Sequence, residues 1–184
     1  MKQAVFLDRD GVIIEENGIF NYKPTDMKLI PKSAEAIKIL NESDYKVIII
    51  SNQSGVARDI FTEHELSLFS KLMKDELKKY GAMIDAEYYC IHHPNALCNC
   101  RKPKNGMIKT AEKDLNINLK KSFIVGDRWS DIEAGIISKC QTILVKTGYG
   151  QKALNSKNLI CNYVATNLFE AVEYIIKTNG HEGI

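Results

Sequence analysis

The stretch Ala4-Val5-Phe6-Leu7-Asp8-Arg9-Asp10-Gly11 joins a short apolar run to two acidic residues near the beginning of the chain. The run 4–7 is apolar at every position, whereas a strand with one solvated face would alternate apolar and polar residues. Strands that are apolar throughout are buried on both faces, as in a parallel sheet with helices on either side. The two acidic residues would therefore follow a buried strand.

Short apolar runs of this kind alternate along the chain with longer segments of helical periodicity. This alternation predicts a doubly wound α/β fold, in which helices cover both faces of a parallel sheet. Ligands of such sheets bind beyond the carboxyl ends of the strands, so functional residues are expected directly after each apolar run. The expected strands are 4–7, 46–50, 87–91, 122–125 and 142–145, and the expected helices are 33–41, 63–80, 106–116, a short one after Ser130, and 168–176.

The bulk composition favours one enzyme-sized unit. The 184 residues, 45% hydrophobic and 26% charged, suffice for one buried core and predict a single domain, 1–184, with a small insertion. The 25 basic and 23 acidic side chains give a formal charge of +2, and the lack of a dense basic run argues against a nucleic-acid or membrane partner. The sequence shows neither a signal peptide nor an apolar run of about 18 residues. We therefore expect a cytoplasmic monomer that acts on a small molecule.

Asp8 and Asp10 are one residue apart, so on an extended chain both carboxylates project to the same side. Such a pair can bind Mg²⁺, which prefers oxygen ligands. The pair could also divide the work of phosphoryl transfer, with Asp8 attacking phosphorus and Asp10 donating a proton to the leaving alcohol. Taken alone, however, the pattern is more typical of an Asx turn that closes a strand.

Polar residues also follow the other expected strands. Ser51-Asn52-Gln53-Ser54-Gly55 offers hydroxyl, amide and backbone N–H groups that could hold phosphate oxygens or simply cap a helix. Arg101-Lys102 could neutralise charge on a transferring phosphoryl group or form a solvated surface pair. Asp127 ends the strand 122–125 and would be a third carboxylate near the metal, or an ordinary turn residue. Asp131 would support the metal site or begin the next helix.

Taken together and in order, Asp8-x-Asp10-Gly11, Ser51, Lys102 and Gly126-Asp127-x-x-x-Asp131 resemble the four motifs of the haloacid dehalogenase superfamily of phosphatases. The resemblance covers residues 3–150. It implies that Asp8 is the nucleophile and Asp10 the general acid and base, while Ser51 and Lys102 hold the phosphoryl group. It also implies that Asp8, the Asp10 carbonyl and Asp127 bind Mg²⁺. Such an arrangement suits phosphoryl transfer, which depends mainly on in-line positioning and charge neutralisation.

The segment 90–105 is polar and rich in cysteine, and we interpret it as an inserted zinc-binding loop. Cys90-x-His92 and Cys98-x-Cys100 are ligand pairs whose spacing places both members of each pair on one face of an extended chain. Two such pairs can hold a structural zinc ion tetrahedrally. His92 shares the parity of Cys90, which favours it over His93; buried cysteine pairs or a redox pair are the alternatives. An ordered loop would also fix the basic residues that follow Cys100.

The motif Cys90-x-His92-x-Pro94 with Cys98-x-Cys100-Arg101-Lys102-Pro103 is similar to the zinc-bearing histidinol-phosphate and heptose-bisphosphate phosphatases of that superfamily. The short interval between the two pairs is compatible with the histidinol-phosphate members, whereas 51–58 and Phe61-Thr62-Glu63 resemble the heptose group. The resemblance favours loss of the 7-phosphate from D-glycero-D-manno-heptose 1,7-bisphosphate, on the route to nucleotide-activated heptose. It implies substrate contacts from Asp8, Arg9, Asp10, Glu16, Asn17, Gly18, Ile19, Ser51, Asn52, Gln53, Ser54, Arg101, Lys102 and Arg128.

Two other classes of protein remain open. A zinc-knuckle module that binds nucleic acid without catalysis would also carry a Cys-His loop, but the chain is nearly neutral and shows no aromatic residues interleaved with basic ones there. A mutase of the same superfamily would carry a larger cap domain, for which this chain has little room. Release of phosphate from a substrate would distinguish an enzyme from the binding module.

Overall fold

A six-stranded parallel sheet forms the centre of the computed structural model, which describes residues 1–18, 20–155 and 159–179. The strand order is β3-β2-β1-β4-β5-β6, and each neighbouring pair runs parallel. The α/β fold class expected from the sequence is confirmed. The strands are β1 Ala4–Leu7, β2 Lys46–Asn52, β3 Ala86–Cys90, β4 Phe123–Gly126, β5 Gln141–Val145 and β6 Tyr163–Ala165.

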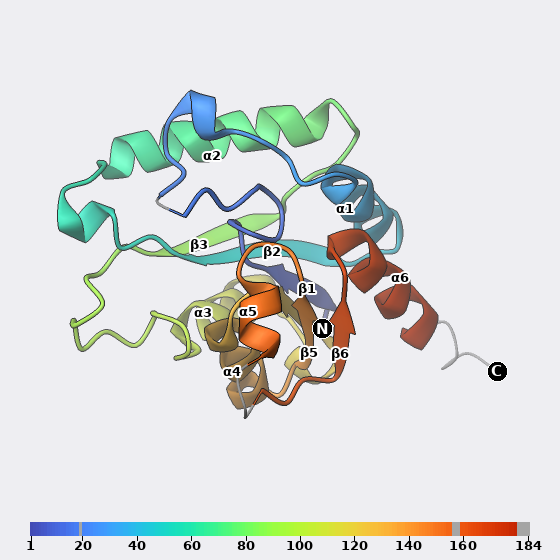
Figure 1. Cartoon of the computed structure of the whole chain (residues 1–184). Coiled ribbons are helices and arrows are strands. Elements are labelled where there is room, and N and C mark those ends of the chain that lie inside the picture. Colours follow the sequence, from blue (N-terminus) through green and yellow to red (C-terminus); the bar gives the residue numbers. More distant parts are fainter. Residues whose placement is uncertain (19, 156–158, 180–184) are drawn as a thin grey trace.

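Helices cover both faces of this sheet (Figure 1). One face carries α1 (Ser33–Glu42), α2 (Glu63–Lys78) and α6 (Leu168–Asn179), and the other carries α3 (Gly106–Leu115) and α4 (Trp129–Ser138). None of the helices in the described part of the chain combines the length and the apolar character that crossing a bilayer requires. The remaining short elements are α5 (Gly150–Leu154) and the 3₁₀ turns Pro24–Asp26, Val56–Arg58 and Leu119–Lys121.

The strand β1 shows why an unbroken apolar run was needed at this place. Val5 and Leu7 point into the core beneath α1, α2 and α6, while Ala4 and Phe6 point into the core beneath α3 and α4. All four side chains are fully buried. Because successive side chains of a strand point to opposite faces, a strand between two helical layers must be apolar at every position.

The centre of the sheet is also where the chain reverses its direction of winding. β1 pairs with β2 on one side and with β4 on the other, so the loops that follow β1 and β4 diverge from each other. Such a switch point leaves a crevice at the carboxyl ends of the strands. The backbone N–H of Asp8 donates to the Val125 carbonyl at 3.1 Å, which continues the sheet beyond Leu7 and fixes Asp8 at this crevice.

The observed elements agree with the expected ones except at the C-terminal end and at strand boundaries. β2 continues to Asn52, so Ser51 is still part of the strand and not of the turn after it. β6 and α5 were not predicted, because a three-residue strand and a five-residue helix that begins with glycine are too short to show a period. Between β1 and α1 the described residues contain no large cap domain, as expected.

Candidate active site

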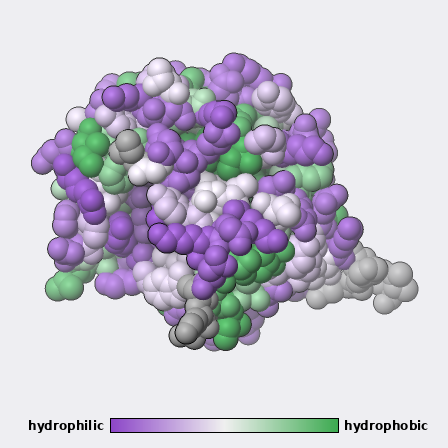
Figure 2. Space-filling model, in the orientation of Figure 1, coloured by the Kyte–Doolittle hydropathy of each residue, from purple (hydrophilic) through white to green (hydrophobic). Residues whose placement is uncertain are grey.

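An open cavity of about 500 Å³ lies where the loops after β1, β2, β3, β4 and β5 converge. Hydrophilic side chains cover much of the face shown in Figure 2, and hydrophobic ones are visible in several smaller patches. The convergence of five loops follows from parallel pairing, because the carboxyl ends of parallel strands all lie at one edge of the sheet. The residues that line the cavity are Asp8, Asp10, Glu16, Gly18, Phe20, Ser51, Asn52, Gln53, Ser54, Arg58, Arg101, Lys102, Arg128, Ser130 and Tyr149.

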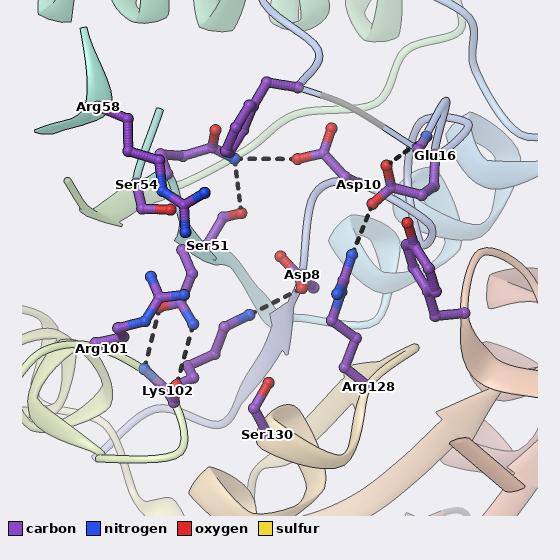
Figure 3. A pocket seen from close by; sticks show the side chains of 15 residues that line it. Asp8, Asp10, Glu16, Ser51, Ser54, Arg58, Arg101, Lys102, Arg128 and Ser130 are labelled. Atoms are coloured by element: carbon purple, nitrogen blue, oxygen red, sulfur yellow. Dashed lines mark hydrogen bonds and ion pairs between the residues drawn. The ribbon is translucent and has the colours of Figure 1, made fainter. Parts of the chain in front are cut away.

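Asp8 and Lys102 form the floor of this cavity (Figure 3). The Lys102 Nζ lies 3.0 Å from Asp8 Oδ2 and 2.6 Å from Asp131 Oδ1, and it donates to the Ile50 carbonyl at 2.7 Å. Burial opposes the charge on Lys102, but Asp131 and Asp8 outweigh it and raise the pKa of the ammonium group. Lys102 is therefore a fixed cation beside the Asp8 carboxylate.

Asp8, Asp127 and Asp131 bring three carboxylates together, with one oxygen of each lying within 4.8 Å of the others. Both oxygens of Asp131 are engaged, one by Lys102 and one by the Arg128 N–H at 3.0 Å. Asp127 Oδ2 accepts the Tyr149 N–H at 2.7 Å, whereas Asp127 Oδ1 is buried and has no hydrogen-bond partner in the described part of the chain. The Arg128 Nε lies 3.9 Å from Asp127 Oδ1. Asp127 Oδ1 and Asp8 fit a hard divalent cation, and Asp131 instead holds Lys102.

The environment of Asp127 opposes its ionisation. Burial raises the pKa of Asp127 to about 8, and the charges of Asp8 and Asp131 act in the same direction, against the Tyr149 hydrogen bond and the Arg128 charge. A buried acid crowded by two others is stabilised as a carboxylate only by added positive charge. A bound divalent cation would supply that charge, which is a second reason to regard the cluster as a metal site.

Asp10 lies on a different side of Asp8 from Lys102 (Figure 3). Its carboxylate accepts from the Arg9 Nε at 3.0 Å, from the Gln53 Nε2 at 3.0 Å and from the Asn21 Nδ2 at 2.6 Å. The Gln53 Nε2 also lies 3.0 Å from Ser51 Oγ, so Gln53 connects the first and second strand ends. Asp10 is thus a carboxyl group on the cavity wall, held in one orientation by three residues.

The outer wall of the cavity carries arginine residues. The Arg128 Nη2 donates to Glu16 Oε2 at 3.0 Å (Figure 3). The Arg128 guanidinium lies over the ring of Tyr149, with its central carbon 4.0 Å from the ring centre. Arg58 and Arg101 line the same cavity from the loops after β2 and β3. Three arginines around an acidic and lysine-bearing floor suit a ligand with more than one anionic group.

The segment 90–105, called here the Cys-His loop, brings four metal-binding side chains together. Cys90 Sγ lies 3.8 Å from Cys98 Sγ and 3.2 Å from Cys100 Sγ, and the His92 Nδ1 lies 3.2 Å from Cys100 Sγ. All four ligand atoms lie within 4.8 Å of one another. Burial raises the pKa of the Cys90 thiol to about 12, so a thiolate there requires a nearby positive charge. The cluster can hold a metal ion.

The same loop delivers Lys102 to the cavity floor. Asn52 at the end of β2 accepts the Lys102 N–H and donates to the Lys102 carbonyl, both at 3.1 Å. At the other side of the loop, Lys104 Nζ donates to the Cys98 carbonyl at 2.6 Å, and the Gly106 N–H donates to the Asn99 carbonyl at 3.0 Å. Lys102 is therefore held both by the neighbouring strand and by the folded loop.

Most of the expected substrate contacts line the cavity, but two that the structure describes do not. The Arg9 side chain is fully buried behind Asp10, with its guanidinium 4.9 Å from the Phe69 ring, so it does not reach the cavity. Asn17 is exposed and does not line the cavity, and Ile19 lies outside the described residues. His93, the alternative to His92, accepts the Asn95 N–H through its ring at 3.3 Å and is not in the metal-binding cluster.

The structure adds residues that the sequence motifs did not single out as site residues. Phe20, Arg58, Ser130 and Tyr149 line the cavity, and Asn21 contacts Asp10 from behind it. Arg58 and Ser130 could have been found by their place after β2 and β4. Tyr149 could have been found in the same way, because it follows β5, whereas Asn21 is far from any strand and no spacing rule indicated it.

Comparison with known proteins finds relatives that cover nearly the whole chain. Residues 99–171 match the family described as HAD-hydrolase-like. The D-glycero-beta-D-manno-heptose-1,7-bisphosphate 7-phosphatase of Photorhabdus laumondii is 37% identical over an alignment of 184 positions that covers 95% of this chain and 97% of that protein. The D-glycero-alpha-D-manno-heptose-1,7-bisphosphate 7-phosphatase of the same organism is 35% identical, over 89% of this chain and 93% of that protein.

A solved structure is also similar to this chain. It is the crystal structure of D,D-heptose 1,7-bisphosphate phosphatase from B. bronchiseptica, complexed with magnesium and phosphate. The TM-score is 0.91 at 31% identity, and the match covers 96% of this chain and 99% of that chain.

Proposed function

The chain belongs to the D-glycero-D-manno-heptose-1,7-bisphosphate 7-phosphatase family of haloacid dehalogenase-like phosphatases, and from this membership we propose how its residues remove the 7-phosphate. The enzyme is a sugar-bisphosphate phosphatase. The observation that carries the mechanism is the position of Asp8, which lies on the floor of the cavity with Lys102 on one side and Asp10 on the other.

In the first half of the reaction, an Asp8 oxygen attacks phosphorus and the bond between phosphorus and the sugar oxygen breaks. The electron pair stays on that oxygen, which takes a proton from Asp10, so the alcohol leaves as a neutral group. Lys102 neutralises charge on the equatorial phosphoryl oxygens, and the Ser51 hydroxyl donates a hydrogen bond to them. The product of this step is an aspartyl phosphate on Asp8.

In the second half, water attacks the phosphorus of the aspartyl phosphate and gives its proton to Asp10. The bond between phosphorus and the Asp8 oxygen breaks, which restores the carboxylate and releases inorganic phosphate. Asp10 serves first as acid and then as base, so it ends the cycle protonated as it began. Asp8 and Lys102 do not need to move between the two steps, because Lys102 is fixed by Asp131 and by the Ile50 carbonyl.

We propose Mg²⁺ as the cation of the carboxylate cluster, held by Asp8, by the Asp10 carbonyl and by Asp127 Oδ1. When bound, Mg²⁺ would offset the negative charge of Asp8 and of the substrate phosphate, which lets the two approach. The B. bronchiseptica structure named above contains magnesium and phosphate, which supports this assignment.

We propose zinc as the ion of the Cys-His loop. Three cysteines and one histidine are the ligands of a tetrahedral structural zinc site, and four protein ligands leave no position for water. Zinc–sulfur bonds of about 2.3 Å place sulfur atoms roughly 3.8 Å apart, close to the separation of Cys90 and Cys98 Sγ. The two metal sites would then differ in role, with magnesium acting on substrate and zinc holding the loop.

The arginine residues of the outer wall support a bisphosphate as substrate. With the 7-phosphate on Asp8 and Lys102, the 1-phosphate would bind to the arginines that line the same cavity, Arg58, Arg101 and Arg128. Glu16 and Gly18, on the opposite loop, line the space between and would contact sugar hydroxyls. Histidinol phosphate carries one phosphate and a cationic amine, so it offers no second anionic group for the three arginines to bind.

The experiment that tests the substrate is phosphate release from both anomers of heptose 1,7-bisphosphate, histidinol phosphate and simple sugar phosphates. We expect the heptose bisphosphates to have the highest kcat/KM, with ³¹P NMR showing that the 7-phosphate is lost and the 1-phosphate retained. A higher kcat/KM for histidinol phosphate would support the histidinol-phosphate alternative. Loss of the 1-phosphate would show that the substrate is bound in the reverse direction.

A further inference from the structure

Asn21 is a buried amide behind the cavity wall, and the reaction described above gives it no role. Its side chain lies in the segment between β1 and α1 and is 1% exposed. The Nδ2 donates to Asp10 Oδ1 at 2.6 Å and to the Glu15 carbonyl at 2.7 Å. The Glu15 carbonyl can only accept hydrogen bonds, so the nitrogen and not the oxygen of the amide must face it.

This orientation leaves the other end of the amide without a partner. Asn21 Oδ1 is buried and has no hydrogen-bond partner in the part of the chain that the structure describes. An unsatisfied buried acceptor destabilises a fold by about 1–3 kcal/mol. An apolar side chain of the same shape would avoid that cost. The hydrogen bonds that the amide nitrogen donates therefore explain the asparagine at this position, and its packing does not.

Arg9 ties Asn21 and Asp10 into one unit. The Arg9 Nη2 donates to the Asn21 carbonyl at 2.8 Å and to Asp10 Oδ1 at 3.3 Å, while its Nε donates to Asp10 Oδ2 at 3.0 Å. Arg9 is fully buried and packs against Phe69. It is therefore a rigid support for both the side chain of Asp10 and the backbone of Asn21.

We propose that Asn21 is a positioning residue that orients the Asp10 carboxyl group for proton transfer, a role that rests on the proposed function of Asp10 as general acid and base. Asn21 touches neither the cavity nor the reacting atoms, so it acts only through Asp10. Arg9 and Gln53 hold Asp10 from the core and from β2, and Asn21 supplies the third direction. Without this contact, Asp10 Oδ1 keeps only the longer bond of 3.3 Å from the Arg9 Nη2, so the carboxyl group is held less firmly.

The expected effect is on chemistry and not on binding. A displacement of about 1 Å in a reacting group can reduce the rate roughly 10²-fold, and Asn21 is one of three supports. We therefore expect Asn21→Ala to lower kcat for a sugar phosphate about 10- to 100-fold, with KM nearly unchanged.

A comparison of substrates with different leaving groups distinguishes a positioning role of Asn21 from a purely structural one. A sugar alkoxide needs a proton as it leaves, whereas the nitrophenolate of p-nitrophenyl phosphate does not. In rapid-mixing experiments, Asn21→Ala should slow phosphoryl transfer from the sugar substrate but release the first equivalent of nitrophenol at the wild-type rate. Hydrolysis of the aspartyl phosphate should then be slow, because Asp10 is also the base of that step, and the phosphoenzyme should accumulate.

Two further variants make the result interpretable. Asn21→Asp keeps the size of the side chain but presents a carboxylate to Asp10 and to the Glu15 carbonyl, so it should show the same leaving-group pattern with a larger loss. Lys28→Ala is the matched control, since Lys28 makes an exposed ion pair with Glu15 at 2.7 Å in the same segment and touches neither Asp10 nor the cavity. Its kinetics should equal those of the wild type.

Equal losses in the rate of phosphoryl transfer from the sugar and nitrophenyl substrates, measured by rapid mixing in both Asn21 variants, would overturn the proposal, and so would full activity of Asn21→Ala. If instead the wild-type enzyme released no phosphate from the heptose bisphosphates, the proposed substrate would be wrong. The role of Asn21 could then still be measured on any sugar monophosphate that the wild type hydrolyses.

Discussion

At the scale of single residues, the cavity floor contains more buried negative than positive charge. Asp8, Asp127 and Asp131 are all buried, and the cation in direct contact with two of them is Lys102. Lys102 contacts Asp8 and Asp131, whereas burial raises the pKa of Asp127 to about 8 and the charges of Asp8 and Asp131 add to this shift. The metal-free site therefore retains a proton on Asp127, and a divalent cation and that proton must compete for the same carboxylate.

This competition predicts that Mg²⁺ binding releases a proton. With the pKa of Asp127 at about 8, the carboxyl group is mostly protonated at pH 7 and mostly ionised at pH 9. The apparent affinity for Mg²⁺ should therefore rise about tenfold between these values. Calorimetric titration with Mg²⁺ in two buffers of different ionisation enthalpy measures the proton release directly. Proton uptake, or no exchange at pH 7, would contradict the role of Asp127, and Asp127→Asn should abolish the exchange.

The nucleophile can be tested with a change of one atom. Asp8→Asn should abolish turnover, because an amide cannot attack phosphorus, and it should also weaken the metal site. The fold should persist, since Asp8 lies after β1 and outside both hydrophobic cores. Circular dichroism and phosphate release measure the two effects, with mass spectrometry to exclude deamidation. Residual activity above that of deamidated protein would rule out the aspartyl phosphate on Asp8.

At the scale of elements, the Cys-His loop is the connection between β3 and α3, and it has two separate supports. One is the cluster of Cys90, His92, Cys98 and Cys100, and the other is the pair of hydrogen bonds between Asn52 and the Lys102 backbone. Arg101 lacks the second support. Loss of the metal should therefore disturb Arg101, at the outer wall, more than Lys102 on the floor.

This difference predicts the behaviour of Cys98→Ser. The variant should lose zinc, have a lower melting temperature and lose activity on the heptose bisphosphate by up to about 10²-fold, because structural zinc orders its loop and a displaced cation stabilises the transition state less. Metal analysis, thermal unfolding and kinetics measure the three effects. Cys161→Ser is the matched control, because Cys161 lies outside the cluster. Loss of zinc at the wild-type rate of turnover would show that the metal does not position the loop.

At the scale of the whole molecule, the sheet separates what stabilises the fold from what performs the reaction. The two hydrophobic cores lie on the faces of the sheet, whereas the cavity lies at the carboxyl edge of the strands. Phe123 illustrates the separation, since it begins β4 at the opposite end from Asp127, is fully buried, and packs edge-to-face with Tyr45 at 6.3 Å. Such residues should contribute to stability without contributing to catalysis.

We therefore expect Phe123→Ala to lower the free energy of unfolding by about 3–5 kcal/mol and to leave kcat/KM unchanged below the melting temperature. Urea unfolding and steady-state kinetics at a low temperature measure the two quantities. Phe123→Leu should give a smaller loss of stability in the same assay. A fall in kcat/KM that grows with the loss of stability would show that the cavity is not mechanically independent of the cores.

Much of the fold and of the site could be predicted from the sequence. The run 4–7 indicated a strand buried on both faces, and the carboxylates after it and after 122–125 indicated an edge where ligands bind. These predictions succeed because parallel pairing brings strand ends together whatever the details of packing. The four residues of the two pairs Cys90-x-His92 and Cys98-x-Cys100 also lie together as expected, although only Cys90 belongs to a strand.

What only the tertiary structure decided is which polar side chains face one another. The sequence placed Arg9 among the substrate contacts, but its guanidinium turns into the core to hold Asp10, and Asp131 turned out to hold Lys102. Asn21 carried no signal, because its role arises from a segment that folds back on the first strand end. The physical reason is that a period or a spacing fixes the direction of side chains only within one element. Contacts between elements depend on how loops fold back, and charge and burial determine those contacts only once the loops are in place.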